Sequence, residues 1–445
     1  MSPSSGETIA RVVEGDAAMA DAAVQAAADA SPRWAALPPA ERAGFLRRLA
    51  ALVADQRDEL ARVLSSDQGK PLFAEAYDEV DELGAYFSMA AEDATRLHGA
   101  VPASVSADRR VAVSRVPLGV VGVVTPWNWP YTMGAELFAP AMAAGNTVVW
   151  VPAPTTSACS GVLAELIAGS GLPPGVFNFV PGLGPVVGAT VVGHPLVSGV
   201  GFIGSVATGS TVAARAAGKA QILELGGNGP MVVLADADLD QAAAGALEAA
   251  YLCAGQSCTA GERFLVEAPV VDAFVERVVE LTRSTVRVGD PFDKATTMGP
   301  LNNEPTADKF DRHVSQAVGA GARLCFGGSR VRGLHERTQR GSGQGCAGGY
   351  GAANPTRCPW GERHCRRHHC ESHRDYDHRH GRGSDEPDRV GYSRREAVLR
   401  CEGAAQQRID RRETGGRAAR VTRCAAGIFV QRFAEQQHGF PARHG

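Results

Sequence analysis

Three polar side chains lie in local sequences that suit carbonyl chemistry. Cys258 lies among small residues in the run 254–261, just before the strand-like run 264–266. A substrate carbonyl could approach such a thiol closely, and nearby backbone N–H groups could donate to the oxyanion formed on attack. A lone cysteine is more often a half-buried structural residue. Two other stretches favour a catalytic role, because Glu224 ends a short apolar run before a glycine turn and Asn128 lies between two prolines and two tryptophans.

Together, these stretches resemble the NAD(P)-dependent aldehyde dehydrogenase superfamily. Residues 255–263 resemble its cysteine motif, residues 224–228 its glutamate motif and residues 126–130 its asparagine motif. The order and the spacing of the motifs also match. The resemblance extends from about residue 16 to about residue 330 and then stops.

The resemblance implies a reaction and a role for each residue. Cys258 would attack an aldehyde to give a thiohemiacetal, and hydride transfer to NAD or NADP would leave a thioester. Asn128 and the Cys258 backbone N–H would stabilise the oxyanion. Glu224 would act as general base for the water that releases the carboxylic acid. Trp129 and either Ser257 or Thr259 would line the aldehyde tunnel, although core packing explains a tryptophan beside a proline equally well.

Apolar runs in the sequence predict the strands and helices that position these residues. Short β-branched runs at 120–124, 147–151, 176–180 and 199–203 alternate with helical segments. This rhythm predicts an α/β fold with a Rossmann-like parallel sheet covered on both faces. An α/β catalytic domain follows, as the resemblance also implies. Ligands of parallel sheets bind at the carboxyl ends of the strands, so the segments after these runs are candidate cofactor contacts.

Two of those segments are glycine-rich. The run 182–188 follows a strand, but its last glycine is one residue late for the dinucleotide fingerprint, so a tight turn is an equal alternative. Small residues in the run 204–209 could bring helix N–H groups to a pyrophosphate, and the resemblance places the diphosphate there. The candidate cofactor-contacting residues are Thr125, Pro126, Trp127, Val151, Pro154, Gly184, Gly204, Ser205, Leu225 and Gly226.

The strand end at 150–154, which the resemblance assigns to the adenosine ribose, departs from the family pattern. The family usually has Lys where this chain has Val151, and NAD-preferring members often have an acid where it has Pro154. Lys would donate to the ribose or to a 2′-phosphate, whereas an acid would repel the phosphate. NAD and NADP therefore both remain open.

Helix signals and the resemblance divide the chain into segments. Asp16 is a plausible N-cap for a helix over residues 17–30, and other helical patterns begin near Pro38, Ala74, Asp238, Val270 and Ala307. The resulting segments are 1–99 with 116–227 for cofactor binding, 100–115 as an oligomerisation hairpin, 228–330 as an incomplete catalytic domain and 331–445 as a tail outside the resemblance. Residues 109–116 alternate like a half-exposed strand.

The tail has a composition of its own. Residues 331–445 contain 22 Arg and 13 Asp plus Glu but no Lys, together with nine of the twelve His and six of the ten Cys. Few Leu or Ile make disorder the physical expectation. Zinc binding by residues such as Cys358, His364 and Cys370 is an alternative, but the spacing fits no common zinc pattern. We expect instead a reading-frame shift near Val331, because out-of-frame translation of GC-rich DNA favours Arg, Gly, Ala, His and Cys.

Composition and charge limit the kinds of partner that we expect for this chain. A net charge of −3 over 445 residues gives no indication of a nucleic-acid partner, and no apolar run reaches the length of a membrane span. The polar start and the scattered cysteines of the first 330 residues favour the cytoplasm. We expect no metal site. The resemblance implies a homo-oligomer, but the family's C-terminal strand is missing from the sequence. The competing functional hypothesis is a truncated, inactive homologue that at most binds nucleotide.

Overall fold

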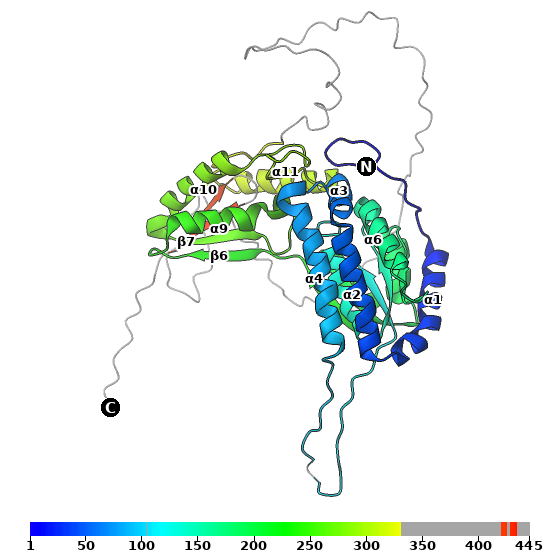
Figure 1. Ribbon diagram of the computed structural model, residues 1–445. Coiled ribbons are helices and arrows are strands. Elements are labelled where there is room, and N and C mark those ends of the chain that lie inside the picture. The colour runs from blue at the N-terminus through cyan, green and yellow to red at the C-terminus, as the bar shows by residue number, and fades with distance from the viewer. Residues whose placement is uncertain (105, 331–419, 425–427, 434–445) are drawn as a thin grey trace, which may run out of the picture. The chain divides into compact units, whose positions relative to one another are not determined.

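The computed structural model describes residues 1–104, 106–330, 420–424 and 428–433 (Figure 1). All of them belong to one compact unit formed by Met1–Gln339 and Leu399–Gly445. Within these residues, no helix is both long and apolar enough to cross a bilayer.

A five-stranded parallel sheet forms the first half of this unit. Its strands lie in the order β3-β2-β1-β4-β5, and every neighbouring pair is parallel. The predicted parallel sheet is therefore confirmed, although β3 is shorter and β4 longer than the apolar runs indicated. The strands are β1 (Val120–Val124), β2 (Thr147–Val151), β3 (Phe177–Phe179), β4 (Val197–Gly204) and β5 (Ala220–Leu225).

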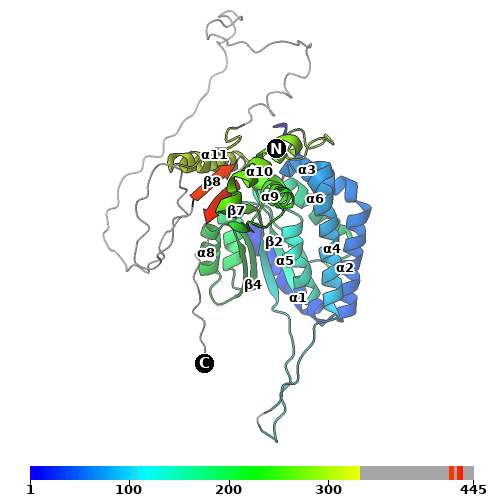
Figure 2. The ribbon, with the colours of Figure 1, turned by 90° about the vertical axis from the view of Figure 1, so that its left-hand side faces the viewer.

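Helices cover both faces of this sheet (Figure 2). Alternate residues of the fully buried strand β2 show the two layers, because Val148 and Trp150 belong to one apolar cluster and Val149 and Val151 to another. Such two-sided burial explains why β2 is continuously apolar. The helices of these layers are α1 (Ala17–Ala36), α2 (Pro39–Asp55), α3 (Arg57–Gln68), α4 (Tyr77–Ala94), α5 (Thr132–Ala143), α6 (Ser157–Gly169) and α7 (Ala189–Gly193).

Two helix starts lie where the sequence predicted them, and an aspartate caps each, although only the Asp16 cap was predicted. The Asp16 carboxylate accepts a hydrogen bond of 2.9 Å from the backbone N–H of Met19 and caps α1. Asp238 accepts from the N–H groups of Asp240 and Gln241 at the start of α9 (Leu239–Tyr251). An aspartate at either position satisfies helix N–H groups that have no intrahelical acceptor.

A second sheet, in the order β6-β7-β9-β8, has a separate apolar core that includes Phe264 and Phe274. Strands β6 and β7 are parallel. The elements of this half are β6 (Gly229–Val233), α9 (Leu239–Tyr251), β7 (Gly261–Glu267), α10 (Val271–Thr285), α11 (Glu304–Gly319), β8 (Arg420–Cys424) and β9 (Ile428–Phe433).

Two strands of the tail differ from the sequence-based expectation. We expected the tail to supply no strands, yet β9 pairs in parallel with β7 and in antiparallel fashion with β8. The run 428–433 is rich in β-branched and aromatic residues, a local pattern that the Arg-rich composition of the whole tail conceals. The remainder of the tail, with its candidate zinc residues, lies outside the described residues.

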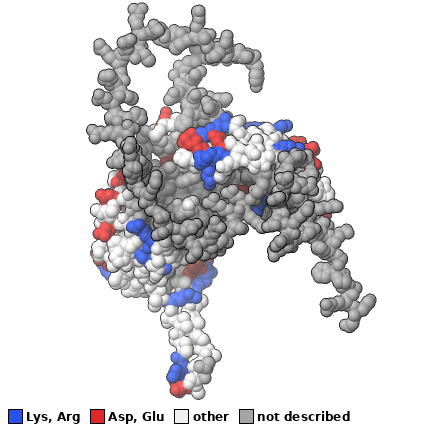
Figure 3. Space-filling model, turned by 180° about the vertical axis from the view of Figure 1, so that it is seen from behind, with Lys and Arg blue, Asp and Glu red and all other residues white. Residues whose placement is uncertain are grey.

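The segment between α4 and β1 projects as a long loop (Figure 1). Ala100 and Val113 exchange two backbone hydrogen bonds in an isolated bridge, so the strand expected at 109–116 reduces to one bridge. The surface of the projection is mostly uncharged in Figure 3, and Val101 and Val116 are largely exposed. Its assignment as an oligomerisation hairpin remains a prediction.

Candidate active site

Cys258 lies in a turn between α9 and β7, and it is partly buried. The chain reaches this turn through consecutive left-handed residues, with φ of 52° at Cys253, 55° at Ala254 and 75° at Gly255. Only glycine adopts this region without a steric cost, so the turn stores backbone strain at the first two positions. Strained backbone persists where surrounding contacts hold it in place, and it often occurs at functional sites.

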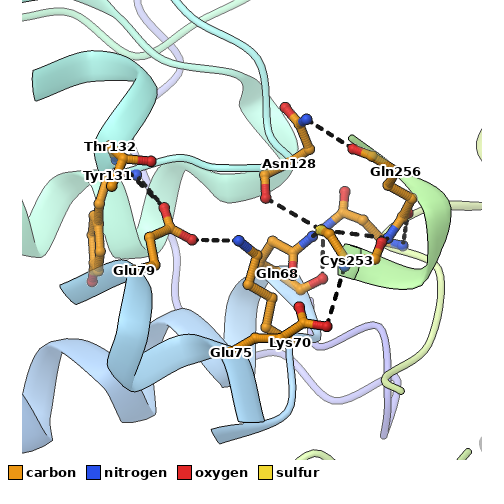
Figure 4. A network of polar contacts seen from close by, with 10 residues as sticks. Gln68, Lys70, Glu75, Glu79, Asn128, Tyr131, Thr132, Cys253 and Gln256 are labelled. Carbon is orange, nitrogen blue, oxygen red and sulfur yellow. Dashed lines mark hydrogen bonds and ion pairs between the residues drawn. The ribbon is translucent and has the colours of Figure 1, made fainter. Parts of the chain in front are cut away.

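The asparagine motif contacts the cysteine turn directly. The Asn128 side-chain Nδ2 donates a hydrogen bond of 2.8 Å to the backbone carbonyl of Gln256, two residues before Cys258 (Figure 4). The thiol of Cys253 lies 3.5 Å from the backbone oxygen of Asn128. A primary amide has two N–H donors, so Asn128 can bind Gln256 and still offer one N–H to an oxyanion.

The glutamate motif packs against the same turn. A Cβ added at Gly227 would lie 2.3 Å from the carbonyl oxygen of Cys258, so the turn requires glycine there. Glu224 is exposed near the carboxyl end of β5, three residues before that contact. The structure therefore brings together the three segments that the sequence singled out.

The surroundings of Cys258 disfavour its thiolate form. Burial raises the pKa of Cys258 above its usual value, and the nearby charge of Glu224 raises it further. The pKa of Glu136 on α5 is also raised, first by burial and then by Glu224. Since only the thiolate is a strong nucleophile, this site needs a group that removes the proton.

Helix α8 (Val206–Arg215) begins directly after β4, at the carboxyl edge of the first sheet. Ser205 caps it by accepting the N–H of Thr208 at 3.2 Å. The first-turn N–H groups of Val206 and Ala207 have no intrahelical acceptor, and both residues are exposed. An exposed helix N-terminus of small residues suits a diphosphate, so Gly204 and Ser205 fit this role.

Glycines at the same edge leave open space for a ligand. A Cβ added at Gly184 or Gly226 would meet no described atom within 4 Å. By contrast, Gly182 is sterically required, since a Cβ there would lie 2.8 Å from the carbonyl oxygen of Gly15. The tight-turn interpretation of this loop therefore explains Gly182 but not Gly184.

Other candidate cofactor residues have structural partners. The Val151 side chain is buried in the core, so only its backbone faces the sheet edge. The Thr125 hydroxyl accepts a hydrogen bond of 2.9 Å from the Trp150 indole. Leu225 packs against Gly209 of α8. The side chains of Val151 and Leu225 thus serve packing, and their contact with a cofactor remains a prediction.

A hollow of about 390 Å³ lies beyond the carboxyl ends of β2 and β3, and Pro154 and Leu183 line it. Pro154 is exposed, as a ribose contact would be. Pro126 and Trp127 are partly exposed in the segment after β1. No group of three or more His, Cys, Asp or Glu side chains is placed to hold a metal ion in the part of the chain that the structure describes.

Sequence reasoning missed a buried polar network beside the cysteine turn (Figure 4). It joins Gln68, Lys70, Glu75 and Glu79 to the segment after Asn128 and to the turn before Cys258. Its partners are up to 185 residues apart in the sequence, so no local pattern could have indicated it. The one available signal was a set of charged residues beside Gly69 and Pro71, where two helical patterns meet.

Comparison with known families gives a match over most of the chain. The model of the aldehyde dehydrogenase family matches residues 1–341. A mitochondrial succinate-semialdehyde dehydrogenase from Rattus norvegicus is 38% identical over 333 residues, which are 74% of this chain and 64% of that protein. An NADP(+) succinate-semialdehyde dehydrogenase from Escherichia coli is 38% identical over 75% of this chain and 69% of its own length. The chain thus spans about two thirds of the length of these relatives.

Solved structures agree. An NAD-dependent aldehyde dehydrogenase from Sinorhizobium meliloti has a TM-score of 0.72 and 38% identity, over 74% of this chain and 66% of that one. An NADP-dependent enzyme from E. coli has a TM-score of 0.73 at 38% identity, over 75% and 69% of the two chains. Structures similar to this chain therefore include enzymes that use either cofactor.

Proposed function

Because this chain belongs to the aldehyde dehydrogenase family, we propose that it oxidises an aldehyde to a carboxylic acid with Cys258 as the nucleophile. The observation that carries the proposal is the convergence of three motifs on one turn. Asn128 donates to Gln256, and Gly227 lies against the Cys258 carbonyl. No single motif would carry the proposal, whereas the contacts of two motifs with the backbone of the turn that bears Cys258 do.

In the first step, the Cys258 thiol loses its proton and the sulfur attacks the aldehyde carbon to form a thiohemiacetal oxyanion. Glu224, whose charge acts on the thiol, assists this ionisation and passes the proton on to solvent, since its side chain is exposed. Its carboxylate is therefore free again before the thioester is hydrolysed. The second N–H of the Asn128 amide and the Cys258 backbone N–H donate to the oxyanion. In other acyl-transfer sites one such donor stabilises the transition state by roughly 3–4 kcal/mol.

A nicotinamide cofactor, when bound, supplies the hydride acceptor that turns the thiohemiacetal into a thioester. The residues that would hold it are Gly204 and Ser205 at the start of α8, with Pro154 and the open backbone at Gly184 and Gly226 along the same edge. Glu224 then takes a proton from the water that attacks the thioester, and the carboxylic acid and the Cys258 thiol are released.

An activity assay tests the proposal. The purified chain is supplied with NAD or NADP and a panel of aldehydes, and the absorbance of the reduced cofactor measures oxidation. Oxidation in the wild type and in the thiol control Cys325→Ala, together with its loss in Cys258→Ala, is the expected result. Oxidation that survives Cys258→Ala would refute the assigned nucleophile.

Succinate semialdehyde enters the panel because several similar proteins are named for it. A neutral aldehyde and a cationic aldehyde should accompany it. The charges of Glu224 and Glu136 act on Cys258, so an anionic substrate would meet repulsion beside the thiol. The cytoplasm remains the expected compartment, and a homo-oligomer remains the expected assembly.

A second candidate is a homologue that binds nucleotide without turnover. The family match ends at residue 341 of 445, and about a third of each relative has no counterpart in the aligned part of this chain. Cofactor binding by calorimetry without oxidation of any aldehyde would favour this candidate. Steady-state oxidation would eliminate it.

We also propose that the reading frame shifts near Val331, close to the end of the family match. Sequencing the encoding DNA across codons 327–336 tests this directly. Another frame that continues the family sequence is the expected result. If no frame does so, the tail is the encoded sequence and the frame-shift proposal is wrong.

A further inference from the structure

Three ionisable side chains are buried where α3 ends and α4 begins, and the proposed chemistry uses none of them. Lys70, Glu75 and Glu79 expose only 2%, 7% and 0% of their surface. Burying charges is costly unless each is paired or hydrogen-bonded, so their partners reveal what this cluster holds in place. A π turn, Leu72–Ala76, joins the two helices, and such turns are frequent at functional sites.

Glu79 fixes the end of the asparagine segment, which is the stretch 126–131 that contains Asn128. Its Oε1 accepts the backbone N–H groups of Tyr131 and Thr132 at 3.0 and 3.4 Å, at the start of α5 (Figure 4). A carboxylate is stabilised at a helix N-terminus, so these bonds lock the point at which the segment enters the helix. Asn128 lies only three residues before this point.

Lys70 connects that carboxylate to the residue beside Asn128. Its Nζ lies 2.6 Å from Oε2 of Glu79 and 3.0 Å from the centroid of the Trp129 ring. A desolvated ammonium over an indole face is held by cation–π attraction. The contact shows that Trp129 packs against Lys70. Lys70 therefore contacts the asparagine segment directly.

The same buried cluster holds the cysteine turn. Glu75 Oε1 accepts the backbone N–H of Cys253 at 3.1 Å, and the Gln68 side chain donates to the Cys253 sulfur at 3.3 Å. These bonds are made by Cys253, the first left-handed residue of the strained turn, and they help to offset the cost of that backbone conformation. Both catalytic segments are therefore tied to residues 68–79.

We propose that Lys70 and Glu79 are positioning residues that place the Asn128 amide relative to the Cys258 thiol. The inference rests on the proposed function, because it takes Cys258 as the nucleophile and Asn128 as a donor to the oxyanion. A displacement of about 1 Å in such a site can lower the rate about 100-fold. Removing the buried pair should therefore slow carbonyl chemistry without changing the thiol itself.

Acylation of Cys258 by p-nitrophenyl acetate measures this effect without any cofactor. The thiolate attacks the ester carbonyl, an oxyanion forms, p-nitrophenolate leaves with the electron pair of the C–O bond, and an acetyl thioester remains. Alkylation by iodoacetamide displaces iodide and forms no oxyanion. The ratio of the two rates at Cys258, with the adducts located by peptide mass spectrometry, isolates oxyanion stabilisation from thiol reactivity.

The double variant Lys70→Met with Glu79→Gln removes both charges, since removing one alone would leave its partner buried and uncompensated. The introduced amide oxygen can still accept from Tyr131 and Thr132. We expect acylation to fall about 10- to 100-fold and alkylation to stay within about threefold of the wild type. The exposed Lys309→Met is the matched control, with both rates unchanged.

Trp129→Leu removes the ring under Lys70 while the ion pair stays intact, so it tests the same inference if the double variant does not fold. Its acylation should fall while its alkylation persists. The inference would be overturned if either folded variant were acylated as fast as the wild type, or if its acylation and alkylation rates fell in parallel. It would also be overturned if the wild-type chain were not acylated at Cys258. A wild type that is acylated but oxidises no aldehyde would instead refute the proposed function.

Discussion

The side-chain amide of Asn128 donates to the backbone carbonyl of Gln256 at 2.8 Å and so joins the two segments that the proposed chemistry requires. Asn128→Ala removes both this link and the proposed oxyanion donor. We expect aldehyde oxidation to fall about 10²- to 10³-fold, as for other lost oxyanion donors. Steady-state rates, with iodoacetamide alkylation of Cys258 as the measure of thiol reactivity, check this. Oxidation within a few-fold of the wild type would show that Asn128 is only structural.

Glu224 has two effects on Cys258 that a single substitution separates. Glu224→Gln removes a negative charge that raises the thiol pKa, so the thiol pKa should fall and alkylation at neutral pH should become faster. Turnover should nevertheless fall about 10²- to 10⁴-fold, because the general base is lost.

Glu136→Gln provides the comparison for that experiment, because Glu136 also raises the thiol pKa but has no proposed part in the reaction. It should give a smaller fall in the thiol pKa and retain turnover. Alkylation measured against pH gives both thiol pKa values. A profile that Glu224→Gln leaves unchanged would place that carboxylate too far from the sulfur to act as its base.

The buried carboxyl of Glu75 makes stability depend on pH. Burial, as the main cause, raises its pKa from 4.5 to about 7, and its Oε2 has no hydrogen-bond partner among the described residues. Between those pH values the Glu75 carboxyl binds its proton more tightly in the folded chain than in the unfolded chain. This contribution to stability is therefore present at low pH and is lost as pH rises through about 7.

Glu75→Gln removes that titration and keeps an acceptor for the Cys253 N–H. Relative to the wild type, the variant should gain stability progressively between pH 4.5 and about 7. Thermal unfolding midpoints across this range provide the measurement. Parallel curves for the two proteins would mean that Glu75 does not titrate in this window.

The strained turn before Cys258 predicts an unusual response to glycine. Ala254 has a φ of 55°, so Ala254→Gly should relieve strain and stabilise the chain by about 1 kcal/mol. The control is Ala244→Gly in the exposed face of α9, which should destabilise by about 0.5–1 kcal/mol. Unfolding midpoints that shift in the same direction for both variants would contradict a left-handed conformation at Ala254.

The sheet and the three motifs could be predicted from the sequence because their signals are local. The buried strand β2 reads as a continuous β-branched run, and the Asp16 cap lies directly before its helix. Cys258 and Glu224 were identified from their neighbours together with a family resemblance. In each case the information needed lies within a few residues of the position in question.

The rest depends on contacts between distant parts of the chain. In the sequence, Lys70 reads as a surface residue beside a turn. In the structure, Glu79 and the Trp129 ring bury it. The left-handed Cys253 could not be predicted either, since partners far away in the sequence stabilise that conformation. Strand β9 has a local strand pattern that the composition of the tail conceals, but its pairing with β7, more than a hundred residues away, could not be predicted.

Trapping the acyl intermediate tests the central claim most directly. In the Glu224→Gln chain, incubated with cofactor and an aldehyde that the wild type oxidises, the thioester should still form, because loss of the Glu224 charge lowers the thiol pKa. The reaction should then stop, because hydrolysis of the thioester lacks its base. Peptide mass spectrometry should then find, on Cys258 alone, the mass of the aldehyde less a pair of hydrogen atoms. The same adduct on another cysteine, or reduction of the cofactor with Cys258 unmodified, would contradict the account.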